Sequence, residues 1–95
     1  MALYAIKARM LDRDGDLVAL QGFETNGKLP ARVGEDRLFS IPEVLGMIED
    51  GDIFDLMCTV AEGRISGGAL ESDGAGWIRE KQPTQRCLIT DLLVL

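Results

Sequence analysis

The residues with the most evident chemistry are carboxylates, and two groups of them are closely spaced. The first is Asp12-Arg13-Asp14-Gly15-Asp16, where three carboxylates stand within five residues, and a hard cation prefers several such oxygen ligands on a tight turn. An EF-hand loop has Gly at its sixth position and Glu at its twelfth, but counting from Asp12 these positions hold Leu17 and Phe23. We therefore interpret the segment as a solvated hairpin turn, with a weak ion site as the alternative, and predict no metal.

The second acidic group surrounds the end of a predicted helix, where the helix dipole makes anions slightly unfavourable. One interpretation is an acidic docking surface for a basic partner. The favoured one is an ordinary solvated face, because charge clusters are common on helices. The group consists of Glu43, Glu49, Asp50, Asp52 and Asp55.

The sequence offers few residues for other kinds of catalytic or metal-binding chemistry. The chain has no His, which removes the commonest general base and the commonest transition-metal ligand. Ser40 has no base to activate it and fits a helix cap better than a nucleophile. Cys58 and Cys87 are too few for a zinc site and stand among apolar neighbours, so we expect buried, reduced thiols, with a disulfide as the alternative. We predict no catalytic residues and no cofactor.

A small basic cluster, Arg79, Lys81 and Arg86, lies near the sole tryptophan, Trp77. Cations interleaved with an aromatic ring can bind nucleic acid. Glu80 interrupts the cluster, however, and the net charge of −6 repels a phosphate backbone. We therefore expect a core tryptophan with the stems of the cations packed around it, and no direct binding of nucleic acid.

The elements that must position these residues fit one domain over residues 1–95, since a chain of this length buries one core. No apolar run approaches the ~20 residues of a membrane helix, so we expect no membrane span. Lys7 and Arg9 lie inside the apolar N-terminal run rather than ahead of it, which differs from a secretory signal and indicates a cytoplasmic protein.

Alternating side chains over 3–11 predict a strand, and Asp14-Gly15 predicts a hairpin turn into a second strand over 16–23. A two-residue turn would place Met10 opposite Ala19, whereas a three-residue loop with a bulge would place it opposite Leu20. Residues 24–39 are rich in turn formers and predict a loop, with one short strand near Arg32.

Ser40-Ile41-Pro42-Glu43 has the pattern of a capping box and predicts a helix that Gly51 ends. Apolar residues recur there with helical spacing, and Leu45 should lie at the centre of the contact with the sheet. A strand over 53–60 should present its apolar side to this helix. Further strands are expected over 64–71, with a bulge at Gly67-Gly68, and over 77–81, followed by a strand or extended tail over 87–95.

These elements predict an α+β fold in which a single short helix packs on one face of an antiparallel sheet of about five strands. Tyr4-Ala5-Ile6, the helix "SIPEVLGMIEDGD", "IFDLMCTV", "GWIREKQPTQ" and the closing "TDLLVL" follow one another along the chain. In this order the chain resembles the small bacterial domains of unknown function called DUF3892. Glu80 stands where that family usually has Thr, and Thr90-Asp91 where it has Asp-Asn. The resemblance implies an α+β fold and transfers no catalytic residue.

The leading functional hypothesis is a non-enzymatic protein-interaction module, with self-association through a sheet edge as one route. The first alternative is an acidic, phage-type inhibitor that mimics nucleic acid and blocks a basic groove, which would align the charges of residues 35–55 along one ridge. The second is a small enzyme that uses two carboxylates converging in an apolar pocket. The expected partner is a protein, and a basic one if the acidic group docks it.

Overall fold

The computed structural model describes residues 2–26, 32–83 and 87–95, and in these ranges it contains one α-helix and seven strands. In chain order the elements are β1 (Leu3–Leu11), β2 (Leu17–Thr25), β3 (Arg37–Ser40), α1 (Ile41–Glu49), β4 (Ile53–Val60), β5 (Gly63–Ser72), β6 (Ile78–Glu80), the 3₁₀ helix η1 (Ile89–Asp91) and β7 (Leu93–Val94). The α+β class is confirmed, with seven strands instead of about five.

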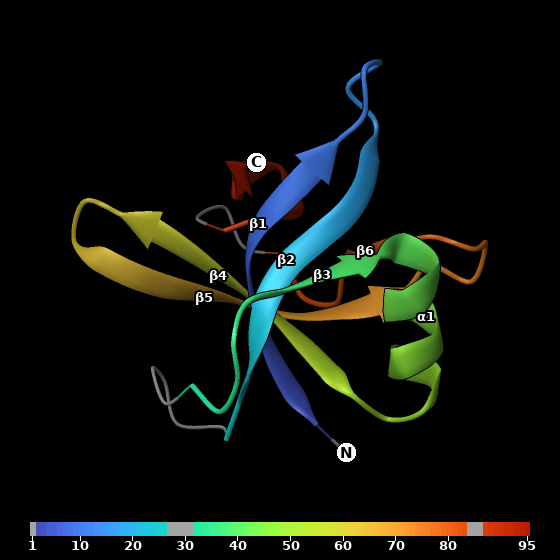
Figure 1. The fold of residues 1–95 in the computed structure, drawn as a ribbon, viewed down its shortest axis with the longest axis horizontal. Helices are drawn as coiled ribbons and strands as arrows, with labels where there is room; N and C mark the ends of the chain where they lie inside the picture. Colours follow the sequence, from blue (N-terminus) through green and yellow to red (C-terminus); the bar gives the residue numbers. More distant parts are fainter. Residues whose placement is uncertain (1, 27–31, 84–86) are drawn as a thin grey trace.

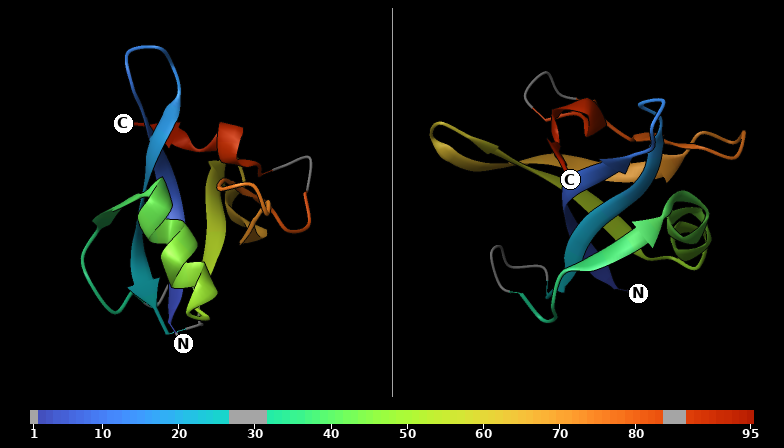
Figure 2. Two further views of the ribbon diagram at one scale, coloured as in Figure 1. Left: turned by 90° about the vertical axis from the view of Figure 1, so that its right-hand side faces the viewer. Right: turned by 45° about the horizontal axis from the view of Figure 1, so that its top comes forward.

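The strands form one sheet in the order β3-β2-β1-β4-β5-β6, and β7 pairs with β1. Most neighbours are antiparallel, but β1 is parallel to both β4 and β7. Helix α1 causes the first parallel pair, because it carries the chain from β3, past β2 and β1, to β4. Figure 2 shows α1 lying across one face of the sheet. The expected all-antiparallel sheet is therefore corrected to a mixed one.

The main core lies between α1 and this face of the sheet. The rings of Tyr4, Phe39 and Phe54 meet there with centroids 5.0–5.3 Å apart. Val44 is fully buried in this core, whereas Leu45 is only half-buried at its margin. The prediction that Leu45 is the central helix residue is wrong by one position.

Helix α1 begins as predicted. The Ser40 hydroxyl oxygen accepts a hydrogen bond from the Glu43 N–H at 3.2 Å, and Pro42 stands in the first turn. Beyond the helix, Gly51 adopts a positive φ of 97°, which favours glycine. The sequence pattern and the structure therefore agree at both ends of the helix.

Three strand details differ in how well they were predicted. Met10 pairs with Ala19, which is the first of the two register alternatives. The predicted bulge in β5 is confirmed, because Leu56 pairs with Gly68 and Met57 with Ser66, leaving Gly67 unpaired. Near Arg32 the structure has an isolated bridge to Thr25.

The segment predicted as a loop before the helix ends in β3, which pairs with β2 and buries Phe39 completely. This strand has only four residues, too few for its alternation to stand out from the surrounding turn formers. At the other end of the chain, the expected strand or tail is divided between η1 and the two-residue β7.

Trp77 is also not where it was predicted. It lies at the turn between β5 and β6, and 43% of its surface is exposed. The Asp73 carboxylate accepts hydrogen bonds from the N–H groups of Ala75 and Trp77, which keeps the backbone in this turn. In the described ranges no helix is long and apolar enough to cross a membrane.

Candidate functional site

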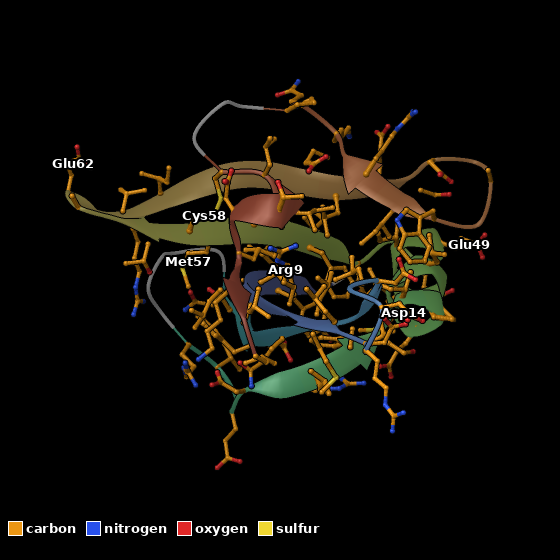
Figure 3. The ribbon with its side chains drawn as sticks, turned by 90° about the horizontal axis from the view of Figure 1, so that it is seen from above. Arg9, Asp14, Glu49, Met57, Cys58 and Glu62 are labelled. Carbon is orange, nitrogen blue, oxygen red and sulfur yellow. A yellow bond between two sulfur atoms is a disulfide. The ribbon has the colours of Figure 1, made fainter. Side chains whose placement is uncertain are left out.

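The acidic group, for which a docking surface was one interpretation, does not form one surface. Glu43 pairs with Arg37, with the two side chains 3.0 Å apart. The Asp52 carboxylate accepts a hydrogen bond from the Ala2 N–H at 2.9 Å and so holds the start of β1 beside the helix–β4 turn. Glu49 and Asp50 are exposed at the end of α1, where Figure 3 labels Glu49.

Asp55 lies on the opposite face of the sheet. Its neighbours Phe54 and Leu56 point into the core beneath α1, and side chains alternate between faces along a strand. Burial among Ala5 and Ala69 on the adjacent strands raises the pKa of the Asp55 carboxyl, because its charged form loses water. The five carboxylates are thus divided between two faces of the molecule.

The carboxylates of Asp12, Asp14 and Asp16 lie within 4.8 Å of one another, and all three residues are exposed. One Asp12 oxygen accepts hydrogen bonds from the N–H groups of Asp14 and Asp16, at 2.8 and 3.0 Å. These contacts are those of a turn stabilised by an aspartate side chain. The geometry therefore accounts for the cluster as part of the β1–β2 hairpin.

The basic cluster is dispersed as well. Arg79 pairs with Glu71 at 2.7 Å across β5 and β6, and Lys81 is exposed beyond the end of β6. Arg86 lies outside the described residues. Trp77 has no cation–π partner among the contacts of the described residues, since the two such contacts found there involve Phe23 and Phe39.

The feature that sequence reasoning missed is the open edge of β4. Strand β4 pairs with β1 only over residues 53–56, and beyond Leu56 the two strands separate. Its remaining residues, Met57–Val60, pair with β5 on one side and with no described strand on the other. Figure 1 shows this end of the β4–β5 hairpin extending away from α1 and the rest of the molecule. We call residues 57–60 the open edge.

The open edge carries no charge and no proline, since its residues are Met57, Cys58, Thr59 and Val60. Such an edge is a template for another strand, and proteins usually protect it with charges, prolines or short strands. The two outer strands of the described sheet are protected in this way: β3 has four residues and includes Arg37, and β6 has three and includes Arg79 and Glu80. The open edge lacks these protecting residues, although Met57 and Cys58 are buried and only Thr59 and Val60 are more accessible.

A groove of about 470 Å³ lies beside the open edge, where β1 and β4 separate. Lys7 borders it and forms an ion pair with Asp36. Apolar side chains continue beyond it at the C-terminus, where Leu93 and Leu95 are 71% and 54% exposed. The groove is lined by Lys7, Ala8, Gln21, Cys58, Thr59, Asp91 and Leu93.

The two cysteines meet at this groove in a disulfide, Cys58–Cys87, with their Cα atoms 5.7 Å apart. The expectation of reduced thiols is therefore wrong, although burial was correct, since their exposed fractions are 4% and 0%. The bulge at Gly67 makes room for the bond: a Cβ atom there would lie 2.3 Å from the Cys87 carbonyl oxygen. A bulge in β5 was predicted, but not its contact with a residue twenty positions later.

Sequence patterns could not have located the open edge, because they do not show where one strand stops pairing with another. The alternation of β4 continues to Val60, so the strand has the same appearance with and without β1 beside it. No family model, curated protein or solved structure matches this chain. The similarity to DUF3892 domains accordingly stays a hypothesis, and functional inference rests on the geometry described above.

Proposed function

We propose that this chain is a non-enzymatic protein-interaction module whose partner is a second copy of itself, bound by strand addition at the open edge. The observation that carries the proposal is the unpaired, uncharged stretch Met57–Val60 at the end of a projecting hairpin. Strand addition uses backbone hydrogen bonds for affinity, so it needs an accessible strand rather than a deep pocket.

The uncharged residues of the open edge allow a second copy to be the occupant, although the net charge of the chain opposes it. The chain carries −6 overall, so two copies repel each other wherever acidic residues face one another. An antiparallel pair of open edges about a two-fold axis would place only uncharged residues opposite each other. The adjoining C-terminal residues Leu93 and Leu95 add exposed apolar surface beside this contact.

The two alternatives have less support. An acidic inhibitor requires carboxylates along one ridge, whereas Glu49 and Asp55 lie on different faces and Glu43 is paired with Arg37. A carboxylate enzyme requires two carboxyl groups converging in an apolar pocket. Asp55 is the one carboxyl in the described chain with a pKa raised by burial, and no other charged group contributes to that shift.

A cytoplasmic location is retained as part of the proposal. In the cytoplasm of mesophiles, disulfides are mostly transient and redox-sensing, so the pair Cys58–Cys87 would then change with the redox state of the cell.

The test is sedimentation equilibrium of the oxidised protein from micromolar to millimolar concentration. We expect a reversible monomer–dimer equilibrium that Thr59→Glu weakens by at least about tenfold, because two added carboxylates would lie close to the two-fold axis. Arg64 pairs with residue 59 across the hairpin, so the new glutamate should leave the hairpin folded.

Two variants serve as matched controls. Thr59→Val keeps a β-branched, uncharged residue at the open edge and should preserve the dimer. Leu38→Glu adds the same charge at an exposed position of the β3 edge and should also preserve it. A protein that stays monomeric throughout, or a dimer that Thr59→Glu does not weaken, would contradict the proposal.

A further inference from the structure

The C-terminal segment, residues 87–95, is attached to the sheet where β1 and β4 separate. Figure 3 shows it passing between Cys58 and Arg9. It comprises η1 and β7 and ends with three exposed apolar residues, Leu93, Val94 and Leu95. The segment forms one wall of the groove beside the open edge, through Asp91 and Leu93.

Its noncovalent attachment to the strands consists of the short β7–β1 pairing and a small set of described hydrogen bonds. The Leu95 N–H donates to the Arg9 carbonyl at 2.9 Å, and the Arg9 Nε donates to the Leu92 carbonyl at 3.3 Å. Further back, the Ile89 N–H donates to the Glu80 carboxylate at 3.0 Å. Cys87 and Leu92 are buried in the core, and Ile89 packs against it.

The covalent attachment is the Cys58–Cys87 disulfide, which joins the start of the segment to β4. Gly67 in β5 lies directly against it, since a Cβ atom at this position would lie 3.0 Å from both the Cβ and the Sγ of Cys87. The disulfide therefore depends on close contact between Cys87 and a backbone position without a side chain. Any group at position 67 would push the segment away.

Most of the strand pairing and the aromatic centre of the core lie outside the segment. The aromatic centre of the core, Tyr4, Phe39 and Phe54, and helix residue Val44 all precede the open edge in sequence. The ladders β1–β2, β2–β3, β1–β4 and β4–β5 involve no residue beyond Ser72. Loss of the segment would remove the β7 pairing and the side chains of Cys87, Leu92 and Ile89 from the core.

We infer that Cys58 and Cys87 form a redox-responsive clamp: their disulfide holds residues 87–95 on the sheet, and its reduction frees this segment while the remaining fold stays intact. The reductant is a dithiol. Its thiolate attacks one protein sulfur, the protein S–S bond breaks, and a mixed disulfide forms. The second thiol of the reductant then displaces the protein sulfur. Two electrons and two protons pass to the protein, leaving two cysteine thiols and an oxidised, cyclic reductant.

Burial makes reduction depend on the segment's own opening. The exposed fractions of Cys58 and Cys87 are 4% and 0%, so a dithiol reaches them only when the segment moves away. Elements held by few contacts open locally without global unfolding. Reduction then removes the covalent restraint, so the opened state becomes the more populated one. The inference holds whether or not the open edge binds a second copy.

The test compares amide hydrogen exchange of the full chain, oxidised and in dithiothreitol, by mass spectrometry. Reduction should accelerate exchange at least about tenfold over residues 88–95, with residues 39–50 of β3 and α1 changing by less than about twofold. The double variant Cys58→Ala with Cys87→Ala should match the reduced protein. Loss of protection throughout the chain, or unchanged exchange over 88–95, would overturn the inference.

A glycine pair tests the contact at Cys87. Gly67→Ala should lower the dithiothreitol concentration at which half the disulfide is reduced, because the new methyl group displaces the Cys87 carbonyl. Gly46→Ala is the matched control, since a Cβ atom at that helix position has open space around it, and it should leave the midpoint unchanged. An unchanged midpoint in Gly67→Ala would show that the contact does not hold the clamp.

Discussion

At the scale of single residues, two aspartates illustrate how the same side chain acquires opposite properties. Burial raises the pKa of the Asp55 carboxyl, since the charged form loses water within the sheet. The pKa of Asp73 is lowered instead, because the N–H groups of Ala75 and then Trp77 donate hydrogen bonds to its ionised carboxylate. Nothing in the sequence around Asp55 or Asp73 indicates that either carboxyl has a shifted pKa.

These pKa shifts predict opposite effects of Asp→Asn substitution at neutral pH. Asp55→Asn should raise the urea midpoint, because the cost of the buried charge appears as pH rises through the ordinary and then the raised pKa. Asp73→Asn should lower the midpoint, because its stabilisation is present above the ordinary carboxyl pKa and is lost as pH falls through the lowered one.

Both differences should disappear at pH values well below the ordinary carboxyl range, where the carboxyl groups and the asparagines are all neutral. Urea unfolding followed by circular dichroism at neutral and acidic pH measures the midpoints of the wild type and of both variants. Equal signs for the two variants at neutral pH would show that burial and hydrogen bonding are not the causes of the shifts.

The predictable residues were those whose role is local. Ser40 and Gly51 act within a few positions of themselves, so their types and spacing were sufficient. Trp77 was misplaced because a hydrophobic side chain does not reveal whether its turn faces the core. The disulfide was only the alternative for a similar reason: its partners are 29 positions apart and are brought together by the fold.

At the scale of elements, α1 is stabilised mainly by contacts with the rest of the fold. It has nine residues, and isolated helices this short are marginal in water. Its stability depends on Ile41 and Val44 packing on the sheet, on the Ser40 cap and on the Glu43–Arg37 pair that links it to β3. The last of these is exposed and contributes little.

Ser40→Ala should therefore destabilise the fold by about 1 kcal/mol, since the Glu43 N–H loses its acceptor. Ser40→Thr keeps an acceptor oxygen and is the control, with a loss well below that of alanine. The free energy of unfolding from urea titrations measures both. Equal stability of wild type and Ser40→Ala would mean that water replaces the hydroxyl without cost.

Element boundaries were predictable in proportion to element length. The nine-residue β1 and the eight-residue β4 carry enough alternation to be recognised, whereas β3 and β7 have four and two residues. Their existence depends on β2 and β1 offering free edges to pair with. The open edge belongs to the same class of feature, because it reflects where β1 stops following β4.

At the scale of the whole molecule, charge and strand pairing act in opposition in the proposed dimer. Sixteen acidic against ten basic side chains give each copy a net charge of −6, while the residues proposed to meet are uncharged. The long-range contribution is thus repulsive and the short-range one attractive. An acidic surface docked on a basic partner would have an attractive long-range contribution, so salt distinguishes the two mechanisms.

Added salt should strengthen self-association through the open edge. Raising the ionic strength from about 0.1 M to 1 M shortens the screening length from ~10 Å to ~3 Å and suppresses the repulsion between copies. The double variant Glu49→Lys with Asp50→Lys should strengthen it at low salt, because each reversal adds two charges and the chain then carries −2. Asp52 is left intact in this variant, since its carboxylate holds the Ala2 amide. Sedimentation equilibrium at both salt concentrations measures the dimer dissociation constant. Association that weakens steeply with salt, and is lost in the double variant, would instead assign binding to the acidic end of α1.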